Sequence, residues 1–383
     1  MKIVATTALC LTVLLANPYA DGDFGNEGVG AVLLWPTARS TALAGAVTGL
    51  ADEADAAFFN PAGLAFQTTA KVDITCAELL PGLYPGMLYG SAIGGAPIRL
   101  PFWDGHRTYV SGGVVYRTTG ETDIVNERGE FLGRVTTWRG WAGLQLAMLL
   151  TERFGTGIGL KIIRDSRYHF GWDYGHYAEG TAVAVDMALL YRHAARVAIG
   201  AAVDNLGPGI TYAGSGEHDP LPAMLRLGAC WTPVESHDFS LRIMPQLDKL
   251  LVGMFRDTTG RKPLGRQLQE EWRDVRKAFA LEVTAFNSVS LRIGYFEDPN
   301  NQLGGIVLKN VEGQTFHYGA WDALTREGLG QLKSIGLCWG FGFGSDVIRF
   351  DLSSDAAIYD FPTKNWKFQI TCNDLGRLFG RRS

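Results

Sequence analysis

The stretch from Trp138 to Leu150, WRGWAGLQLAMLL, carries apolar or small residues at every second position. Its intervening positions include Arg139 and Gln145, so the two faces of the segment differ in polarity. Successive residues of a β-strand point to opposite sides, and a period of two therefore indicates a strand with one apolar face. This stretch predicts a strand rather than a helix.

The same alternation recurs along the chain from Lys71 onward. Apolar residues occupy every second position in the runs 183–191, 279–285, 291–295, 348–352 and 366–370, and the opposite face is repeatedly charged. Alternation alone leaves the buried face undecided. A soluble sandwich buries its apolar face, whereas an outer-membrane barrel exposes that face to lipid.

Three further features favour the barrel. Short connections such as 151–154 and 192–196 alternate with long ones such as 120–137, 165–178 and 298–329, as in bacterial barrels. Aromatic residues fall near strand ends, where a girdle at the membrane interface needs them. An N-terminal export signal places the chain beyond the inner membrane. We therefore expect an all-β fold: a fourteen-stranded antiparallel transmembrane β-barrel at 70–383 with an N-terminal plug. The predicted strands lie near 70–79, 86–97, 107–119, 138–150, 153–165, 179–192, 195–206, 222–232, 238–247, 277–287, 288–297, 331–343, 346–355 and 364–373.

Residues 1–20 have the features of a cleaved signal peptide, because Lys2 precedes an apolar run and Ala20 offers a small residue before the cut. We therefore expect an outer-membrane location, with membrane lipid as a partner. A net charge of -4 offers no basic surface for nucleic acid. The histidines and cysteines lack metal or disulfide spacing, and no nucleophile elbow or phosphate loop is present. The sequence thus indicates no enzyme, no metal site and no cofactor.

The polar faces of the predicted strands would line the barrel interior with charges of both signs. Mixed signs favour an interior packed with ion pairs over a charge-selective pore. The segment 21–69, which precedes the first strand, is long enough to fold into the barrel as a plug. An acidic helical turn at 52–57 is followed by a turn at Asn60, Pro61, Ala62 and Gly63, since proline bars helix continuation. The expected interior residues are Arg139, Gln145, Lys161, Asp186, Asp204, Arg226, Arg242, Glu282, Arg292, Arg349, Asp351, Lys367 and Gln369.

Two blocks of the sequence resemble a known family. Residues 42–65, which contain ALAGA, GLADEADA and FNPAGLA, resemble the N-terminal signature of the PorV/PorQ branch of the FadL-like outer-membrane barrels. The stretch 201–228, with AAVDNLGPGI followed by LP and LRLG, is similar to the pattern of that branch in the middle of the barrel. Membership of the FadL class implies a fourteen-stranded barrel with a hatch bearing Asn-Pro-Ala that moves hydrophobic compounds. The PorV/PorQ branch implies type IX secretion, with the C-terminal domains of secreted cargo and a large translocon barrel as partners.

The long outer loops contribute two candidate features. Leu264, Leu268, Trp272 and Val275 recur at helical spacing within 256–277, which predicts an amphipathic helix. We favour a cap packed on the barrel rim over a partner-binding helix. Aromatic residues, the side chains that protein interfaces favour, cluster in two loops and could bind a partner or pack on the rim. They are Tyr168, Phe170, Trp172, Tyr174 and Tyr177 in one loop, and Phe316, Tyr318 and Trp321 in the other.

Two functions compete at this point. Uptake of a hydrophobic molecule calls for a mostly apolar cavity, whereas the predicted interior carries charges on strand after strand. The sequence therefore favours a secretion component that binds or shuttles cargo proteins, with uptake of hydrophobic compounds as the alternative. An uptake site would lie in the plug among Leu33, Leu34 and Trp35.

Overall fold

The computed structural model describes residues 34–379 apart from 80, 82–85, 102–105, 127, 170–175, 195, 215, 256–261, 274, 297–306, 310–314, 318–335 and 356–364. Most of the described chain is strand, as the period of two predicts. Among these residues, no helix is long and apolar enough to cross a membrane. The predicted signal peptide at 1–20 lies outside the described residues.

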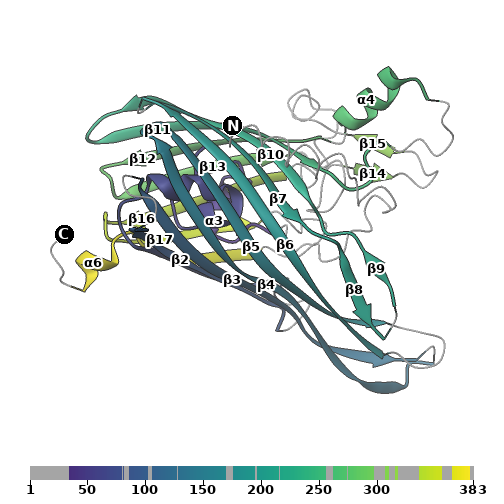
Figure 1. Cartoon of the computed structure of the whole chain (residues 1–383). Helices are drawn as coiled ribbons and strands as arrows, with labels where there is room; N and C mark the ends of the chain where they lie inside the picture. Colours follow the sequence, from purple (N-terminus) through teal and green to yellow (C-terminus); the bar gives the residue numbers. More distant parts are fainter. Residues whose placement is uncertain are drawn as a thin grey trace.

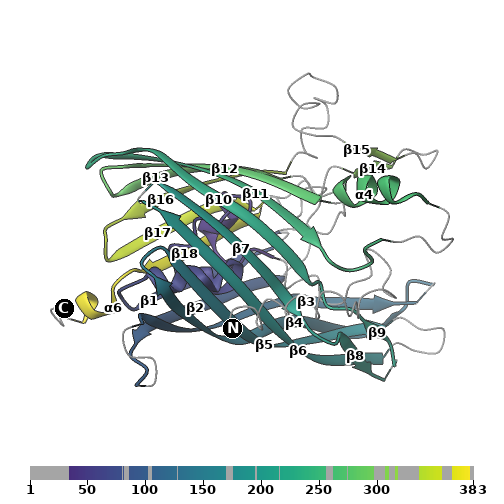
Figure 2. The same ribbon diagram turned by 45° about the horizontal axis from the view of Figure 1, so that its top comes forward.

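The strands form one closed antiparallel barrel (Figures 1 and 2). The first and last strands pair, with Val72 opposite Cys372, and this pairing closes the ring. The ring has fourteen strands in chain order, so the predicted count is confirmed. They are β1 (Lys71–Glu78), β2 (Leu88–Ile98), β3 (Thr108–Val125), β4 (Phe131–Thr151), β5 (Phe154–His169), β6 (His176–His193), β7 (Val197–Leu206), β10 (Met224–Glu235), β11 (Phe239–Leu250), β12 (Val275–Ala285), β13 (Val289–Phe296), β16 (Gly336–Gly344), β17 (Ile348–Asp355) and β18 (Asn365–Cys372).

Two of the predicted long loops are largely strand. β3 and β4 continue as a hairpin to a turn at Asn126, whose side chain accepts hydrogen bonds from the backbone N–H groups of Arg128 and Glu130. β5 and β6 likewise stay paired as far as His169 and His176. Alternating residues such as Ile124, Phe131 and Val135 suit a strand in water as well as in lipid. The prediction of loops is therefore wrong for 120–125, 131–137, 165–169 and 176–178, which are strand, whereas 127 and 170–175 lie outside the described residues.

Smaller elements decorate the two ends of the barrel. The long-loop end carries β8 (Ile210–Ala213) and β9 (His218–Asp219), which extend the sheet at β6. It also carries a separate two-stranded sheet of β14 (Val307–Lys309) and β15 (Thr315–His317), and the helix α4 (Leu264–Arg273). The other end carries α6 (Leu375–Leu378), close to the start of β1, because Leu375 N–H donates to the Ala70 carbonyl. Figure 1 shows α4 and α6 at opposite ends. We call the end with the long loops the outer end.

The two faces of the barrel wall are opposite in character. Outward-facing side chains are large and apolar, for example Leu144 at 68% exposure, Phe350 at 54% and Phe368 at 56%. Inward-facing side chains of the same strands are polar and buried, for example Gln145, Asp351 and Gln369. An apolar outside and a polar inside are inverted relative to a soluble protein, and they define a transmembrane β-barrel.

Candidate functional site in the barrel interior

The chain from Leu34 to Gln67, here called the inner segment, lies inside the barrel (Figures 1 and 2). It contains two short helices, α2 (Ala38–Ala42) and α3 (Ala56–Phe59), and a 3-10 helix, η2 (Pro61–Phe66). A capping box starts α2, where Thr37 and Ser40 each bind the other's backbone N–H. The predicted acidic helical turn at 52–57 is wrong in position, because α3 begins only at Ala56, after the acidic residues.

Wall side chains supplement the hydrogen bonds that the backbone of the inner segment makes within itself. Gln246 on β11 accepts from Thr48 N–H and donates to the Gly45 carbonyl, both at 2.9 Å. Gln369 on β18 accepts from Arg39 N–H at 2.9 Å, and Lys367 donates to the Trp35 carbonyl at 2.8 Å. A buried backbone group without a partner is costly. These inward-facing polar residues therefore fix the inner segment to the wall.

The Asn60–Gly63 turn is buried, with Pro61 and Ala62 against β5 and Asn60 against β6 and β7. The Asn60 amide donates to the carbonyls of Thr48, at 2.8 Å, and Leu189, at 3.1 Å, and its oxygen accepts from Ala62 N–H, which caps η2. Pro61 occupies the first turn of η2, where its missing N–H costs nothing. Asn60 thus links two parts of the inner segment to one strand.

Glycines of the wall allow this close approach. A Cβ on Gly157 of β5 would lie 2.5 Å from the Pro61 carbonyl carbon, and one on Gly200 of β7 would lie 2.2 Å from the Thr48 oxygen. Gly63 is equally confined, with the Ala51 oxygen 2.2 Å from its would-be Cβ. Backbone packs on backbone here, so the strand glycines serve close approach.

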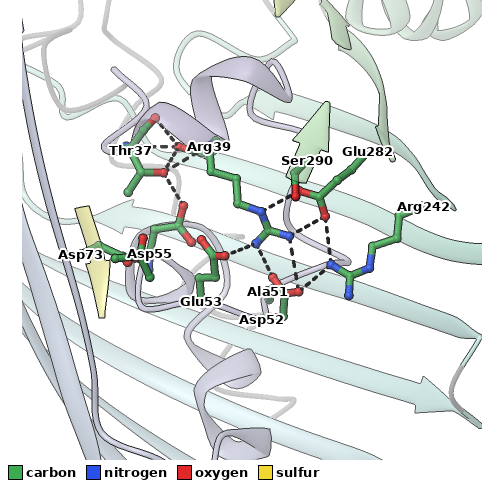
Figure 3. Close-up of polar contacts among 12 residues, drawn as sticks. Thr37, Arg39, Ala51, Asp52, Glu53, Asp55, Asp73, Arg242, Glu282 and Ser290 are labelled. Carbon is green, nitrogen blue, oxygen red and sulfur yellow. Dashed lines mark hydrogen bonds and ion pairs between the residues drawn. The ribbon is translucent and has the colours of Figure 1, made fainter. Parts of the chain in front are cut away.

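Buried charges join the inner segment to the second half of the barrel, as Figure 3 shows for Arg39 and its neighbours. Arg39 binds Glu282 on β12 through two parallel hydrogen bonds of 2.8 Å, and it binds Asp52 at 2.6 Å. Glu282 also accepts from Arg242 at 2.9 Å and from Arg292 at 2.6 Å. We call these five residues the Arg39 cluster. A bidentate geometry with several partners is what makes a buried ion pair favourable.

Charged groups in and around the inner segment shift the pKa values of Asp52 and Arg39. Burial opposes the ionisation of Asp52, but the Arg39 and Arg242 guanidinium groups hold its pKa well below the usual range. Burial likewise lowers the pKa of Arg39, and the carboxylates of Asp52, Glu282 and Glu53 raise it by more. Arg39 and Asp52 therefore both stay ionised at neutral pH, and their ion pair holds two parts of the inner segment together.

A second charged group uses the stretch 201–228 that resembles the PorV/PorQ pattern. Asp204 pairs with Arg226, and Asn205, at a φ of 59°, accepts from Lys161 Nζ at 3.0 Å. Lys161 also pairs with Asp186 at 2.8 Å. The left-handed backbone at Asn205 accompanies a register shift between β6 and β7. In this structure the motif organises the barrel wall internally.

On β13 and β4 the inward-facing residues change from polar to apolar towards the outer end, whereas β5 and β12 carry the buried Asp165 and Arg276 nearer that end. Along β13 the order is Arg292 and then Phe296, and along β4 it is Gln145 and then Trp141. Trp35 of the inner segment meets Phe296 edge to face, with ring centroids 5.1 Å apart. The buried apolar residues on this side form one connected cluster, here called the apolar layer. It includes Leu34, Trp35, Leu43, Val47, Phe58, Leu79, Met87, Tyr89, Val115, Trp141, Ile163, Leu250 and Phe296.

The predicted loop aromatics are only partly described. Tyr168 and Tyr177 lie opposite each other on β5 and β6, with their rings edge to face at 5.2 Å. They are strand residues that pack on each other. Phe316 lies in β15, whereas Phe170, Trp172, Tyr174, Tyr318 and Trp321 lie outside the described residues. Partner binding by these aromatics remains a prediction.

The amphipathic helix predicted within 256–277 is present as α4, but it is no packed cap. Leu264, Leu268 and Trp272 are more than half exposed along one face. Glu271 of the same helix pairs with Lys249 at 2.7 Å. Helix α4 is therefore attached through Glu271, while Leu264, Leu268 and Trp272 remain exposed.

Sequence reasoning found the charged lining of the barrel but missed Arg39, the residue that connects it to the inner segment. All the predicted interior residues face inward. The sequence does contain a signal that the wall and the inner segment are connected by ion pairs. The strands carry Arg242, Arg292 and Arg349, and the inner segment carries Asp52 and Glu53. Opposite charges in two segments that share an enclosed space are expected to pair.

Fold and interior together define the class: a transmembrane β-barrel of the outer-membrane type, with its N-terminal chain folded inside. No family model matches the chain, and no curated protein is similar to it. Its resemblance to the PorV/PorQ branch therefore rests on the sequence blocks alone.

Several solved structures share the barrel fold. The Ralstonia pickettii toluene transporter TbuX is 13% identical with a TM-score of 0.43, over 83% of this chain and 92% of that one. A Pseudomonas aeruginosa FadL homologue is 11% identical with a TM-score of 0.44, over 88% and 97%. The Pseudomonas putida toluene transporter TodX is 11% identical with a TM-score of 0.43, over 83% and 92%. This likeness is loose, and the barrel described above rests on its own strand pairing.

Proposed function

We propose that this protein is an outer-membrane channel for small hydrophobic compounds, a function of the FadL-like type. The observation that supports this proposal is the apolar layer, which spans the barrel on the outer side of the Arg39 cluster. On that side the apolar layer offers a hydrophobic compound a mostly apolar surface, interrupted by the buried Asp165 and the Asp248–Arg276 pair, and a mostly apolar surface with few polar groups is what a binding site for such compounds requires.

The charged interior, which at first favours a secretion role, has another explanation. Each buried carboxylate of the Arg39 cluster faces a guanidinium group, and the wall glutamines face the inner segment's backbone. These charges hold the inner segment in place, and Asp52 and Arg242 also line a small pocket beside β7 and β10. They therefore carry no weight against a hydrophobic substrate.

Uptake by whole cells tests the proposal. The chain is expressed in a bacterial strain whose own channels for hydrophobic compounds are deleted, and initial uptake is measured for labelled toluene, oleate and glutamate. We expect faster uptake of toluene or oleate than with an empty vector, and no change for glutamate. Rates equal to the empty vector for both apolar compounds, with the barrel folded in the membrane, would contradict the proposal.

A secretion component that binds cargo proteins is a second candidate, and the exposed face of α4 favours it. Leu264, Leu268 and Trp272 present an apolar stripe at the outer end, of the kind that binds a protein partner. Affinity purification from native membranes tests this candidate. Recovery of exported proteins that share a C-terminal domain, and its loss in Trp272→Ala, would support secretion. Recovery of bound hydrocarbon or fatty acid without protein supports the channel.

A further inference from the structure

Three carboxylates meet where the inner segment packs against β1. Glu53, Asp55 and Asp73 each place one oxygen within 4.8 Å of the other two. Their exposures are 3%, 5% and 0%, so all three are removed from solvent. Figure 3 shows Asp55 and Glu53 together, with Asp73 beside them, to one side of the Arg39 cluster.

The neighbouring cations do not balance this group. Arg39 and Arg349 both approach the same oxygen of Glu53, Oε1, and both are shared with other carboxylates. In the described part of the chain, Asp55 and Asp73 form no ion pair with lysine or arginine. Asp55 accepts from the Thr37 hydroxyl at 2.6 Å, and its own N–H donates to Asp73 at 3.1 Å. Positive charge is therefore lacking where the three carboxylates meet.

Several buried oxygens at this place have no hydrogen-bond partner among the described residues. They include Glu53 Oε2 and Asp73 Oδ1. Thr75 Oγ1, on the next inward position of β1, and Gln67 Oε1, whose amide nitrogen binds the Glu53 carbonyl at 2.7 Å, have none either. Leaving buried acceptors unpaired is costly, and the cost is larger for carboxylates.

We propose that Glu53, Asp55 and Asp73 bind one divalent cation of the calcium type, which ties the inner segment to β1. Hard cations of this kind take carboxylate, amide and hydroxyl oxygens at roughly 2.3–2.6 Å. Two ligands on opposite sides of such an ion are roughly 4.8 Å apart, so three oxygens that lie within 4.8 Å of one another can share one ion. The unpaired Glu53 Oε2 and Asp73 Oδ1 are the oxygens available for it. A proton shared between Asp55 and Asp73 is the competing explanation.

The metal content of the full-length protein in detergent tests the site. One sample is equilibrated with Ca²⁺ and dialysed against metal-free buffer, a second is refolded in EDTA, and both are analysed for bound metal and for thermal unfolding. We expect close to one calcium per chain in the first sample and a lower melting temperature in the second. The absence of calcium from the first sample, together with identical melting of both, would overturn the proposal.

Variants separate a cation from a shared proton. Asp55→Asn and Asp73→Asn should weaken Ca²⁺ binding by at least about tenfold. Asp248→Asn, which removes a buried carboxylate on β11 bound to Arg276 and Arg226, should retain the calcium. If Asp55→Asn is as stable as the wild type or more so, both in Ca²⁺ and in EDTA, the proton explanation holds and the cation is excluded. A variant is folded if its heated sample migrates more slowly on a gel than its unheated sample. If a variant does not fold, the calcium content and melting temperature of the wild type still test the proposal.

Discussion

Arg39 and Glu282 are 243 residues apart in the chain, yet inside the barrel the Arg39 guanidinium donates two hydrogen bonds of 2.8 Å to the Glu282 carboxylate. Both side chains are almost fully buried. Glu282 in turn binds Arg242 and Arg292, so this single carboxylate connects the inner segment to β11, β12 and β13.

Replacing Glu282 with Gln should therefore destabilise the barrel strongly. The substitution leaves three guanidinium groups short of one negative charge, and breaking a buried pair from one side costs about 3–5 kcal/mol. Urea unfolding of the protein in detergent measures the change. Arg134→Gln is the control, because Arg134 pairs with Glu121 and Asp123 in a largely exposed position. A Glu282→Gln variant no less stable than the Arg134 control would show that the Arg39 cluster does not hold the inner segment.

Replacing Asn60 with Ala should loosen the inner segment. The change removes the cap of η2 and leaves the carbonyls of Thr48 and Leu189 without this donor, at a cost of roughly 1–3 kcal/mol. Asn126→Ala, in the exposed turn between β3 and β4, should have a smaller effect because water replaces its bonds. Current through planar bilayers provides a second measurement. We expect a low current for the wild type and a higher one for Asn60→Ala combined with Pro61→Ala, and equal negligible currents would remove any gating role for this turn.

Adding one methyl group at Gly157 should disturb the contact with the inner segment. The new Cβ would lie 2.5 Å from the Pro61 carbonyl carbon, and such overpacking costs about 1–3 kcal/mol. Gly133→Ala is the matched control on β4, since nothing lies within 4 Å of its would-be Cβ. Limited proteolysis and urea unfolding compare the two variants. Equal stability of both would mean that the inner segment lies further from β5 than the structure shows.

Replacing Phe296 with Ala should change the uptake of hydrophobic compounds, because Phe296 contacts Trp35 in the apolar layer. Phe350→Ala removes the same side chain from the lipid-facing surface of β17, where 54% is exposed. We expect the toluene or oleate uptake rate to change for the first variant and to stay at the wild-type value for the second. Unaltered uptake in both variants would show that the apolar layer does not lie on the transport path.

The barrel could be predicted from the sequence because its signal is local. Strands such as β18 alternate Trp366, Phe368 and Ile370 with Lys367 and Gln369, and this pattern fixes both the element and its polar face. The ends of the strands were less predictable. β3 and β4 continue past the membrane region, where alternation no longer distinguishes a strand from a loop of mixed composition.

The interior could be predicted only in part, for a physical reason. Inward-facing charges follow from alternation, but the choice of partner depends on where an irregular segment folds in three dimensions. Nothing near Arg39 in the sequence indicates Glu282, and nothing near Asp73 indicates Asp55. Of the apolar layer, the sequence indicated only Leu34 and Trp35. Trp35, Trp141 and Phe296 come from three distant parts of the chain and become one surface only when the barrel closes.

The distance in sequence between Arg39 and its partners also bears on assembly. The inner segment lies near the start of the chain, whereas the side chains that bind it, Glu282 and Arg349, lie on β12 and β17. At Gly157 and Gly200 the backbone of the wall touches the backbone of the inner segment, so the finished ring leaves little space between them. We therefore expect the pairing of β1 with β18, which closes the ring, to be coupled to the burial of the inner segment, so that the two form a single folding unit.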